Sequence, residues 1–362
     1  MWIVTIGILI ALLLTYLESS GQLKNGMLYG FIIVATLQMI HYDFGNDYMG
    51  YLQNYNEYTR YVFNYQSIKD GVFYKDWGWV ILCFLFKPLG GFFTMVAVLS
   101  IIQNIIIYRF IQREIRSDLL LFAVFIYLVN TAFYVLGFSM LRQWFVCCVF
   151  LGMWKYIKKK NWIIPLVVLS SCSLIHASAR ILIPFAFFGF LPVNKGKVLV
   201  WVLLLFIAFL WLAKEPVLNM LEGVIKVGSF EDYFSTYSDD ESTATFRLGF
   251  VLNCIPIVLS LLYLWNNEGD ECSRRMVIMS VIPFLLIPFA QIVPLIGRIG
   301  NYFAIYQIAS YPIIYKAVNK KIIRQACTAI YVLITIYGYF GFYASPVWRE
   351  HFSTFHTIFS VL

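Results

Sequence analysis

The chain has 362 residues, of which 61% are hydrophobic and 13% are charged, and its mean hydropathy is +0.76. Soluble domains carry about 25% charged residues, so this composition excludes an ordinary soluble protein and predicts a polytopic membrane protein. The formal charge of +8 is distributed over short loops between apolar runs, which argues against a nucleic-acid partner. Spanning segments must satisfy their own backbone hydrogen bonds in lipid, so we predict an all-α bundle that forms a single transmembrane domain over 1–362.

Long apolar runs divide most of the chain into candidate membrane spans. Runs of about 17–22 residues suit one crossing each, and they predict about twelve transmembrane helices, within a range of roughly eleven to fourteen. The predicted spans lie near 1–17, 27–41, 91–108, 118–136, 139–156, 162–177, 178–192, 197–213, 246–265, 276–293, 298–316 and 322–343. The first run lacks a basic start and a cleavage site, so we expect it to be a helix and not a removed signal. The run 77–89 is too short to cross alone, and it predicts a re-entrant helix or half of a broken one.

Lysine and arginine gather in short loops that the span count puts on one side of the membrane. Five loops hold 15 of the 27 basic residues, near 109–116, 155–160, 195–197, 274–275 and 316–324. This is the pattern of cytoplasmic loops. The segment 42–76 and a longer loop at 214–245 then fall on the outer face.

Tyrosines in the first outer segment recur every three or four residues, which predicts an amphipathic outer-face helix over about 47–65. They are Tyr48, Tyr51, Tyr55, Tyr58, Tyr61 and Tyr65. Tyrosine has a flat apolar ring and a hydroxyl group, so this face suits either the lipid headgroup layer or the binding of sugar rings.

The stretch before this helix, HYDFGNDY, contains His41, Asp43, Asp47 and Tyr48 around a glycine that allows a tight turn. An aspartate at this place is a candidate to orient a sugar hydroxyl or to accept its proton. The simpler alternative is turn chemistry, with Asp47 capping the tyrosine helix.

Ionisable residues also stand at the outer ends of apolar runs. A charged side chain at mid-bilayer costs about 2.5–3.5 kcal/mol on insertion scales, so such residues usually face a polar cavity. The candidates are Arg142 with Gln143, His176, Arg180, Arg247 and Arg298. His176 and Arg180 are four residues apart and would share one face if an α-helix continued between them.

Each of these residues also has a simpler interpretation. An arginine at a span end can extend to the interface and contact lipid phosphates, and a buried histidine is often a structural hydrogen-bond partner. Together, several arginines favour an anionic ligand, and an aromatic surface favours carbohydrate. The combination indicates a lipid-linked sugar diphosphate, and a lipid flippase would also fit it. The cysteine spacing and the scattered carboxylates predict no metal site and no cofactor.

Five short motifs in order resemble the EpsG family of bacterial exopolysaccharide proteins, relatives of Wzy-type O-antigen and capsule polymerases. The matching blocks are HYDFGNDY at 41–48, Asp76-Trp77-Gly78-Trp79, Arg142-Gln143, His176-Ala177-Ser178-Ala179, and Arg298 with Tyr302. The chain departs from the pattern at His41, where the family usually has arginine. A histidine supplies the same positive charge only when it is protonated, so this position differs in chemistry from the family.

The resemblance implies a polymerase of polysaccharide repeat units in the bacterial cytoplasmic membrane, with its site at the outer face. It implies transfer of a growing glycan from a polyprenyl diphosphate to a sugar hydroxyl of a second lipid-linked unit. Arg142, Arg298 and Arg180 would hold the diphosphate, and His176 or Asp47 would deprotonate the acceptor. Remaining candidates for substrate binding are Gln143, Tyr302, His41, Asp43, Tyr48, Arg247 and Asp76. The expected partners are the polyprenyl-diphosphate-linked oligosaccharide, membrane lipids, and a flippase and chain-length regulator of the same pathway.

Two other classes remain open. A flippase or transporter of lipid-linked oligosaccharides would need a cavity that reaches both membrane faces, and it often contains an internal repeat, which the sequence lacks. A polytopic sugar acyltransferase would place its histidine and arginine near a cytoplasmic acyl donor.

Overall fold

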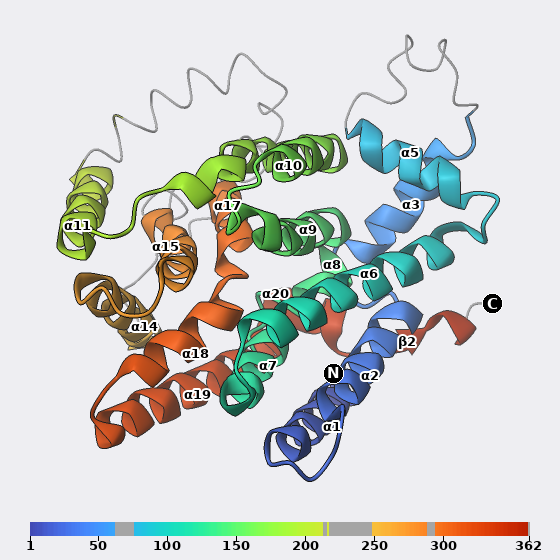
Figure 1. Ribbon diagram of the computed structural model, residues 1–362. Helices are drawn as coiled ribbons and strands as arrows, with labels where there is room; N and C mark the ends of the chain where they lie inside the picture. Colours follow the sequence, from blue (N-terminus) through green and yellow to red (C-terminus); the bar gives the residue numbers. More distant parts are fainter. Residues whose placement is uncertain (62–75, 213–215, 217–247, 288–293, 361–362) are drawn as a thin grey trace. The chain divides into compact units, whose positions relative to one another are not determined.

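The computed structural model describes residues 1–61, 76–212, 216, 248–287 and 294–360, and the account below concerns these residues. The chain forms two compact units, Met1–Phe190 with Thr335–Leu362, and Leu191–Ile334. Helices make up nearly all of the described structure (Figure 1). The protein is therefore an all-α membrane protein, as the apolar composition predicted.

The first unit contains the N-terminal helices, the last helices and a short two-stranded sheet. Its elements are α1 (Trp2–Ser19), α2 (Gly26–Ile40), β1 (His41–Tyr42), α3 (Tyr48–Tyr58), α5 (Trp77–Phe86), α6 (Gly91–Glu114), η1 (Ser117–Leu119), α7 (Leu120–Val129), α8 (Leu136–Ser139), α9 (Leu141–Ile157), α10 (Ile163–Ile175), η2 (Ala177–Phe190), α20 (Pro346–Phe352), β2 (His356–Thr357) and η3 (Ile358–Ser360). The helix α19 (Lys321–Ala344) begins in the second unit and ends in the first.

Neighbouring helices of the first unit form a continuous series of contacts (Figure 1). Helix α1 packs against α2 and α7, α2 packs against α6, α6 against α9, and α9 against α10. The short helix α5 contacts α3, α6 and α10. This arrangement brings the starts of α5 and α9 and the end of α10 within reach of one another.

The tyrosine helix exists, but its tyrosine face points into the protein. In α3, Tyr48, Tyr51 and Tyr55 are at most 9% exposed and pack in one cluster with Trp79 and Phe92. Residues 62–65, at the end of the predicted helix, lie outside the described part. Burial of large aromatic rings is strongly favourable, so this face anchors α3 to α5 and α6.

The end of the chain covers the loop that follows α2. Strand β2 pairs antiparallel with β1, with His41 opposite Thr357 and Tyr42 opposite His356. Phe44 packs its ring against Phe352 and Phe355 at centroid distances of 5.0 and 5.2 Å. The conformation of the HYDFGNDY loop is thus supported from a segment about 300 residues away in sequence.

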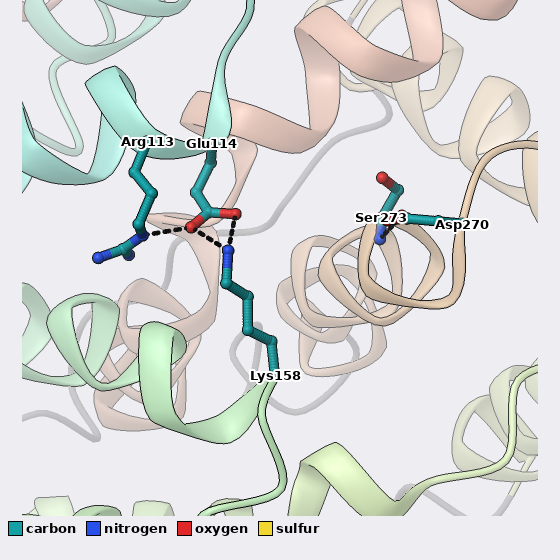
Figure 2. A network of polar contacts seen from close by, with 5 residues as sticks. All are labelled: Arg113, Glu114, Lys158, Asp270 and Ser273. Carbon is teal, nitrogen blue, oxygen red and sulfur yellow. Dashed lines mark hydrogen bonds and ion pairs between the residues drawn. The ribbon is translucent and has the colours of Figure 1, made fainter.

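The second unit is also helical. Its elements are α11 (Gly196–Leu212), α14 (Leu248–Trp265), α15 (Glu271–Leu285), α17 (Pro294–Ala304) and α18 (Gln307–Ala317). Helix α15 packs against α14, α17 and α18, and α14 packs against α11 and α18. Asp270 caps α15 by accepting a hydrogen bond from the backbone N–H of Ser273 at 2.7 Å (Figure 2). The predicted outer loop 214–245 lies almost wholly outside the described residues.

The predicted count of about twelve spans is not borne out. Among the described residues, three helices are long and apolar enough to cross a membrane, namely α1, α6 and α19. Most of the other predicted spans are shorter helices or are interrupted. The run 118–136 contains a turn after Val129, the run 178–192 is the 3₁₀-helix η2 with Pro184 inside it, and the run 298–316 is divided between α17 and α18. Hydropathy alone does not register these breaks.

One end of the first unit is marked by a charged cluster. Glu114, at the end of α6, accepts hydrogen bonds from Arg113 Nε at 2.5 Å and from Lys158 Nζ at 2.8 and 2.9 Å (Figure 2). These contacts bring the basic loops 109–116 and 155–160 together. Arg142 stands at the opposite end of α9, about 25 Å from Lys158 at 1.5 Å per residue. Arg142 and the lysine loop therefore lie at opposite ends of α9.

Candidate active site

Asp76 connects two segments that are far apart in sequence. Its Oδ2 atom accepts a hydrogen bond from Arg142 Nη1, and its Oδ1 atom accepts one from the backbone N–H of Ala177 at 3.0 Å. The side chains of Asp76 and Arg142 are 13% and 22% exposed. Three of the motif blocks seen in the sequence thus meet at one partly buried ion pair, which remains accessible from solvent.

The start of α5 determines where the Asp76 carboxylate points. Asp76 precedes the helix in a left-handed conformation, with φ 52° and ψ 54°, and its side chain does not cap α5. Gly78 allows the first turn to lie directly on the end of α10. A Cβ atom at this position would be 2.9 Å from the carbonyl carbon of Leu174 and 3.1 Å from the backbone nitrogen of Ile175. This close approach places Asp76 beside Ala177.

The end of α10 differs from the prediction. The helix ends at Ile175, His176 has an extended backbone with φ −148° and ψ 115°, and a 3₁₀-helix begins at Ala177. An α-helical face shared by His176 and Arg180 therefore does not exist, because the helix does not continue between them. Arg180 is exposed in η2, and His176 is half-buried immediately before the amide that Asp76 holds.

Tyr51 of α3 lies beneath the Arg142 guanidinium. The guanidinium carbon is 5.3 Å from the centre of the Tyr51 ring, a cation–π distance, and Tyr51 packs on Trp79 with a centroid separation of 5.6 Å. Burial raises the pKa of Tyr51, against the lowering effect of the Arg142 charge, so the ring stays neutral. Tyr51 and Trp79 are not among the site residues predicted from the sequence, although Tyr51 belongs to the tyrosine series and Trp79 to the motif at 76–79.

The HYDFGNDY loop is held against the residues that precede Arg142. Gly45 has φ +127°, which other residues rarely adopt, and a Cβ atom there would lie 2.9 Å from Ser139 Cα. The Asp47 backbone N–H donates to Ser139 Oγ at 3.3 Å. Asp47 stands before α3 without a capping hydrogen bond from its side chain, and its charge contributes to the raised pKa of Tyr51. Asp47 therefore belongs to the surroundings of Arg142.

His41 has no exposed surface in this structure. Its Nδ1 atom lies 2.6 Å from the carbonyl oxygen of Gln38 and its Nε2 atom 3.2 Å from that of Phe138. Tyr48, which is also fully buried, donates its hydroxyl to the His41 carbonyl at 3.2 Å. Both residues connect the loop to its support, whereas Asp43 is exposed, with φ +48°.

A buried polar network below His41 was not recognised in the sequence. Asn104 Nδ2 donates to Gln38 Oε1 at 2.6 Å, and Tyr127 donates to Asn104 Oδ1 at 3.0 Å. Ser100 Oγ donates to the Gln38 carbonyl at 3.1 Å. Polar residues inside otherwise apolar helices were the available signal for this network.

The remaining candidates are divided between both units. Gln143 is 2% exposed in α9. Arg298 and Tyr302 belong to α17 of the second unit, where Tyr302 is fully buried and Arg298 is half-buried. Arg247 lies outside the described residues. The structure thus brings Asp76, Arg142 and the His176 block together in the first unit. Arg298 and Tyr302 belong to the second unit.

Comparison with known proteins identifies the family. The sequence model described as the EpsG family matches residues 26–353, which includes every motif block discussed above. No curated protein and no solved structure matches the chain. The match extends over nearly the whole chain. The chain therefore belongs to the EpsG family, a family of Wzy-like polymerases.

Proposed function

We propose that this protein polymerises the repeat units of an exopolysaccharide. It transfers a growing glycan from a polyprenyl diphosphate to a sugar hydroxyl of another lipid-linked unit, at the outer face of the bacterial cytoplasmic membrane. Membership of the EpsG family supports the polymerase class. The observation that carries the assignment of the site is the contact of Asp76 with both Arg142 and the Ala177 amide.

Arg142 is the proposed ligand of the diphosphate. A polyprenyl diphosphate is already a competent leaving group, so catalysis chiefly requires stabilisation of the negative charge that develops on it. A guanidinium has five N–H donors in a planar fork and stays protonated. Asp76 can therefore orient one edge of Arg142 while another edge binds phosphate oxygens. Arg298 and Arg180 remain proposed as further diphosphate ligands.

A general base completes the reaction by taking the proton of the acceptor hydroxyl. The two candidates are His176 and Asp47. The backbone beside His176 is fixed because Asp76 holds the next amide, at 3.0 Å. Asp47 is fixed through its own amide, which contacts Ser139. Buried Tyr48 and His41 then act as supports of the Asp47 loop.

The first test examines the glycans of a strain that lacks this protein. A strain that lacks the gene should export glycans of a single repeat unit. Lipid-linked units are still assembled and moved across the membrane by a separate flippase, but they are not joined to one another. The lipid-linked and exported glycans are measured by mass spectrometry. Absence of any exported unit would instead support the flippase, and full-length polymer that lacks only acyl groups would support the acyltransferase. A chain-length regulator of the same pathway is a further expected partner.

A further inference from the structure

The exposed face of α3 borders a cavity that the reaction as described above does not use. The cavity has a volume of about 490 Å³, within the range of about 300–1,000 Å³ found for small-molecule sites. Its described lining residues are Met49, Leu52, Gln53, Asn56, Glu57, Arg60 and Tyr61. All of them except Leu52 are exposed, on the outer side of the helix or in the turn that follows it, whereas Leu52 is half-buried and packs against the tyrosine cluster.

The lining suits a neutral ligand with many hydroxyl groups. Gln53 and Asn56 offer amide donors and acceptors, Glu57 accepts hydrogen bonds, and Arg60 donates them. The charges of Glu57 and Arg60 offset each other, so the cavity has no excess positive charge to bind a diphosphate. Tyr61 adds an aromatic surface, to which the apolar face of a sugar ring can pack.

The cavity and the Arg142 contact are on two different faces of α3. The inward face of the same helix contributes Tyr51, whose ring centre is 5.3 Å from the Arg142 guanidinium carbon. A helix with its side chains is about 10–12 Å across, so the cavity and the Arg142 site are separated by one helix diameter. Because α3 itself stands between the two places, an oligosaccharide of a few sugars must pass around this helix to bind in the cavity while its diphosphate end is near Arg142.

We propose that this cavity is a binding subsite for the glycan portion of the lipid-linked repeat unit. The inference rests on the proposed polymerase function, and it assigns the place at which the polymerase binds the sugars of its substrate. Of the tyrosines that suggested carbohydrate binding in the sequence, Tyr48, Tyr51 and Tyr55 anchor the helix, whereas Tyr61 and the amide and charged side chains of the cavity contact the glycan.

The test compares a double variant with a matched control on the same helix. Gln53→Ala/Asn56→Ala removes two cavity-lining amides, and Asn54→Ala removes an exposed amide that is not part of the lining. The probe is the lipid-free oligosaccharide released from the lipid-linked repeat unit, titrated against purified full-length protein. We expect its Kd to rise about tenfold in the double variant, for the loss of two hydrogen bonds, and to stay unchanged in the control. In polymerisation assays KM should rise similarly while kcat stays within about twofold.

The design separates failure of this inference from failure of the polymerase assignment. If the double variant binds the oligosaccharide as tightly as Asn54→Ala does, the subsite is overturned, whether or not polymer is made. If wild-type protein makes no polymer, the proposed function is overturned. Glu57→Gln is a second, more conservative variant that keeps the side-chain volume, and it should also weaken binding of the oligosaccharide. All four substituted positions are exposed, so thermal unfolding of the variants should match the wild type.

Discussion

Replacing Arg142 by alanine should reduce polymerisation at least about 100-fold, the loss typical when one group that stabilises transition-state charge is removed. The arginine is already held in place by Asp76 and by the Tyr51 ring, so its side chain loses little conformational entropy when a diphosphate binds. Arg142→Lys keeps the positive charge but loses the planar fork, and we expect activity between those of wild type and Arg142→Ala. The measurement is the rate of long-chain product formation by purified variants present in equal amounts.

A control for folding accompanies this prediction. Removing Arg142 leaves the partly buried Asp76 carboxylate without its cation, at a cost of about 1–3 kcal/mol in the free energy of unfolding. Asp76→Asn removes that negative charge and keeps the shape, and it should restore stability in the Arg142→Ala background without restoring activity. A folded Arg142→Ala protein that builds chains at the normal rate would contradict the assigned role.

Replacing Gly78 by alanine should have the second largest effect, although Gly78 contacts no ligand in the proposed mechanism. The new Cβ would stand 2.9 Å from the Leu174 carbonyl carbon, which belongs to the backbone and cannot rotate away. Helix α5 must then move off α10, at a cost of about 1–3 kcal/mol typical of overpacking. The shift separates Asp76 from the Ala177 amide. Activity should therefore fall by more than the loss of folded protein accounts for.

Gly50 supplies a matched control for this substitution. It lies in the neighbouring helix α3, is exposed, and has open space where a Cβ would be. Gly50→Ala should therefore leave activity unchanged and add up to about 1 kcal/mol of stability through helix propensity. Thermal unfolding and polymerisation rates of both variants check the pair. Equal behaviour of the two variants would show that the α5–α10 contact does not position the site.

The short sequence motifs contain residues that the structure brings together, but the motifs did not predict how these residues are arranged. Asp76, Arg142 and His176 were all selected from short motifs, and the structure joins Asp76 to Arg142 and to the residue after His176. Their separate positions in the chain carry no information on which carboxylate oxygen contacts which donor. That geometry depends on Gly78 and on the packing of α5 against α10.

Other expectations failed for identifiable physical reasons. The spacing of the tyrosines predicted one helical face, but it does not show whether that face turns to lipid, to sugar or to the core. Tyr48, Tyr51 and Tyr55 turn to the core because Trp79 and Phe92 offer them a large apolar surface. Helical spacing between His176 and Arg180 assumed a continuous α-helix, and the backbone instead changes to extended and then 3₁₀ geometry.

The most direct measurement of the central claim uses purified protein in lipid vesicles supplied with labelled polyprenyl-diphosphate-linked repeat units. The product glycans are separated by size, and released polyprenyl diphosphate is quantified. We predict glycans of many units, one polyprenyl diphosphate released for each linkage formed, and neither product with Arg142→Ala. Folded wild-type protein that leaves every unit single, or that only moves units across the bilayer, would contradict the account.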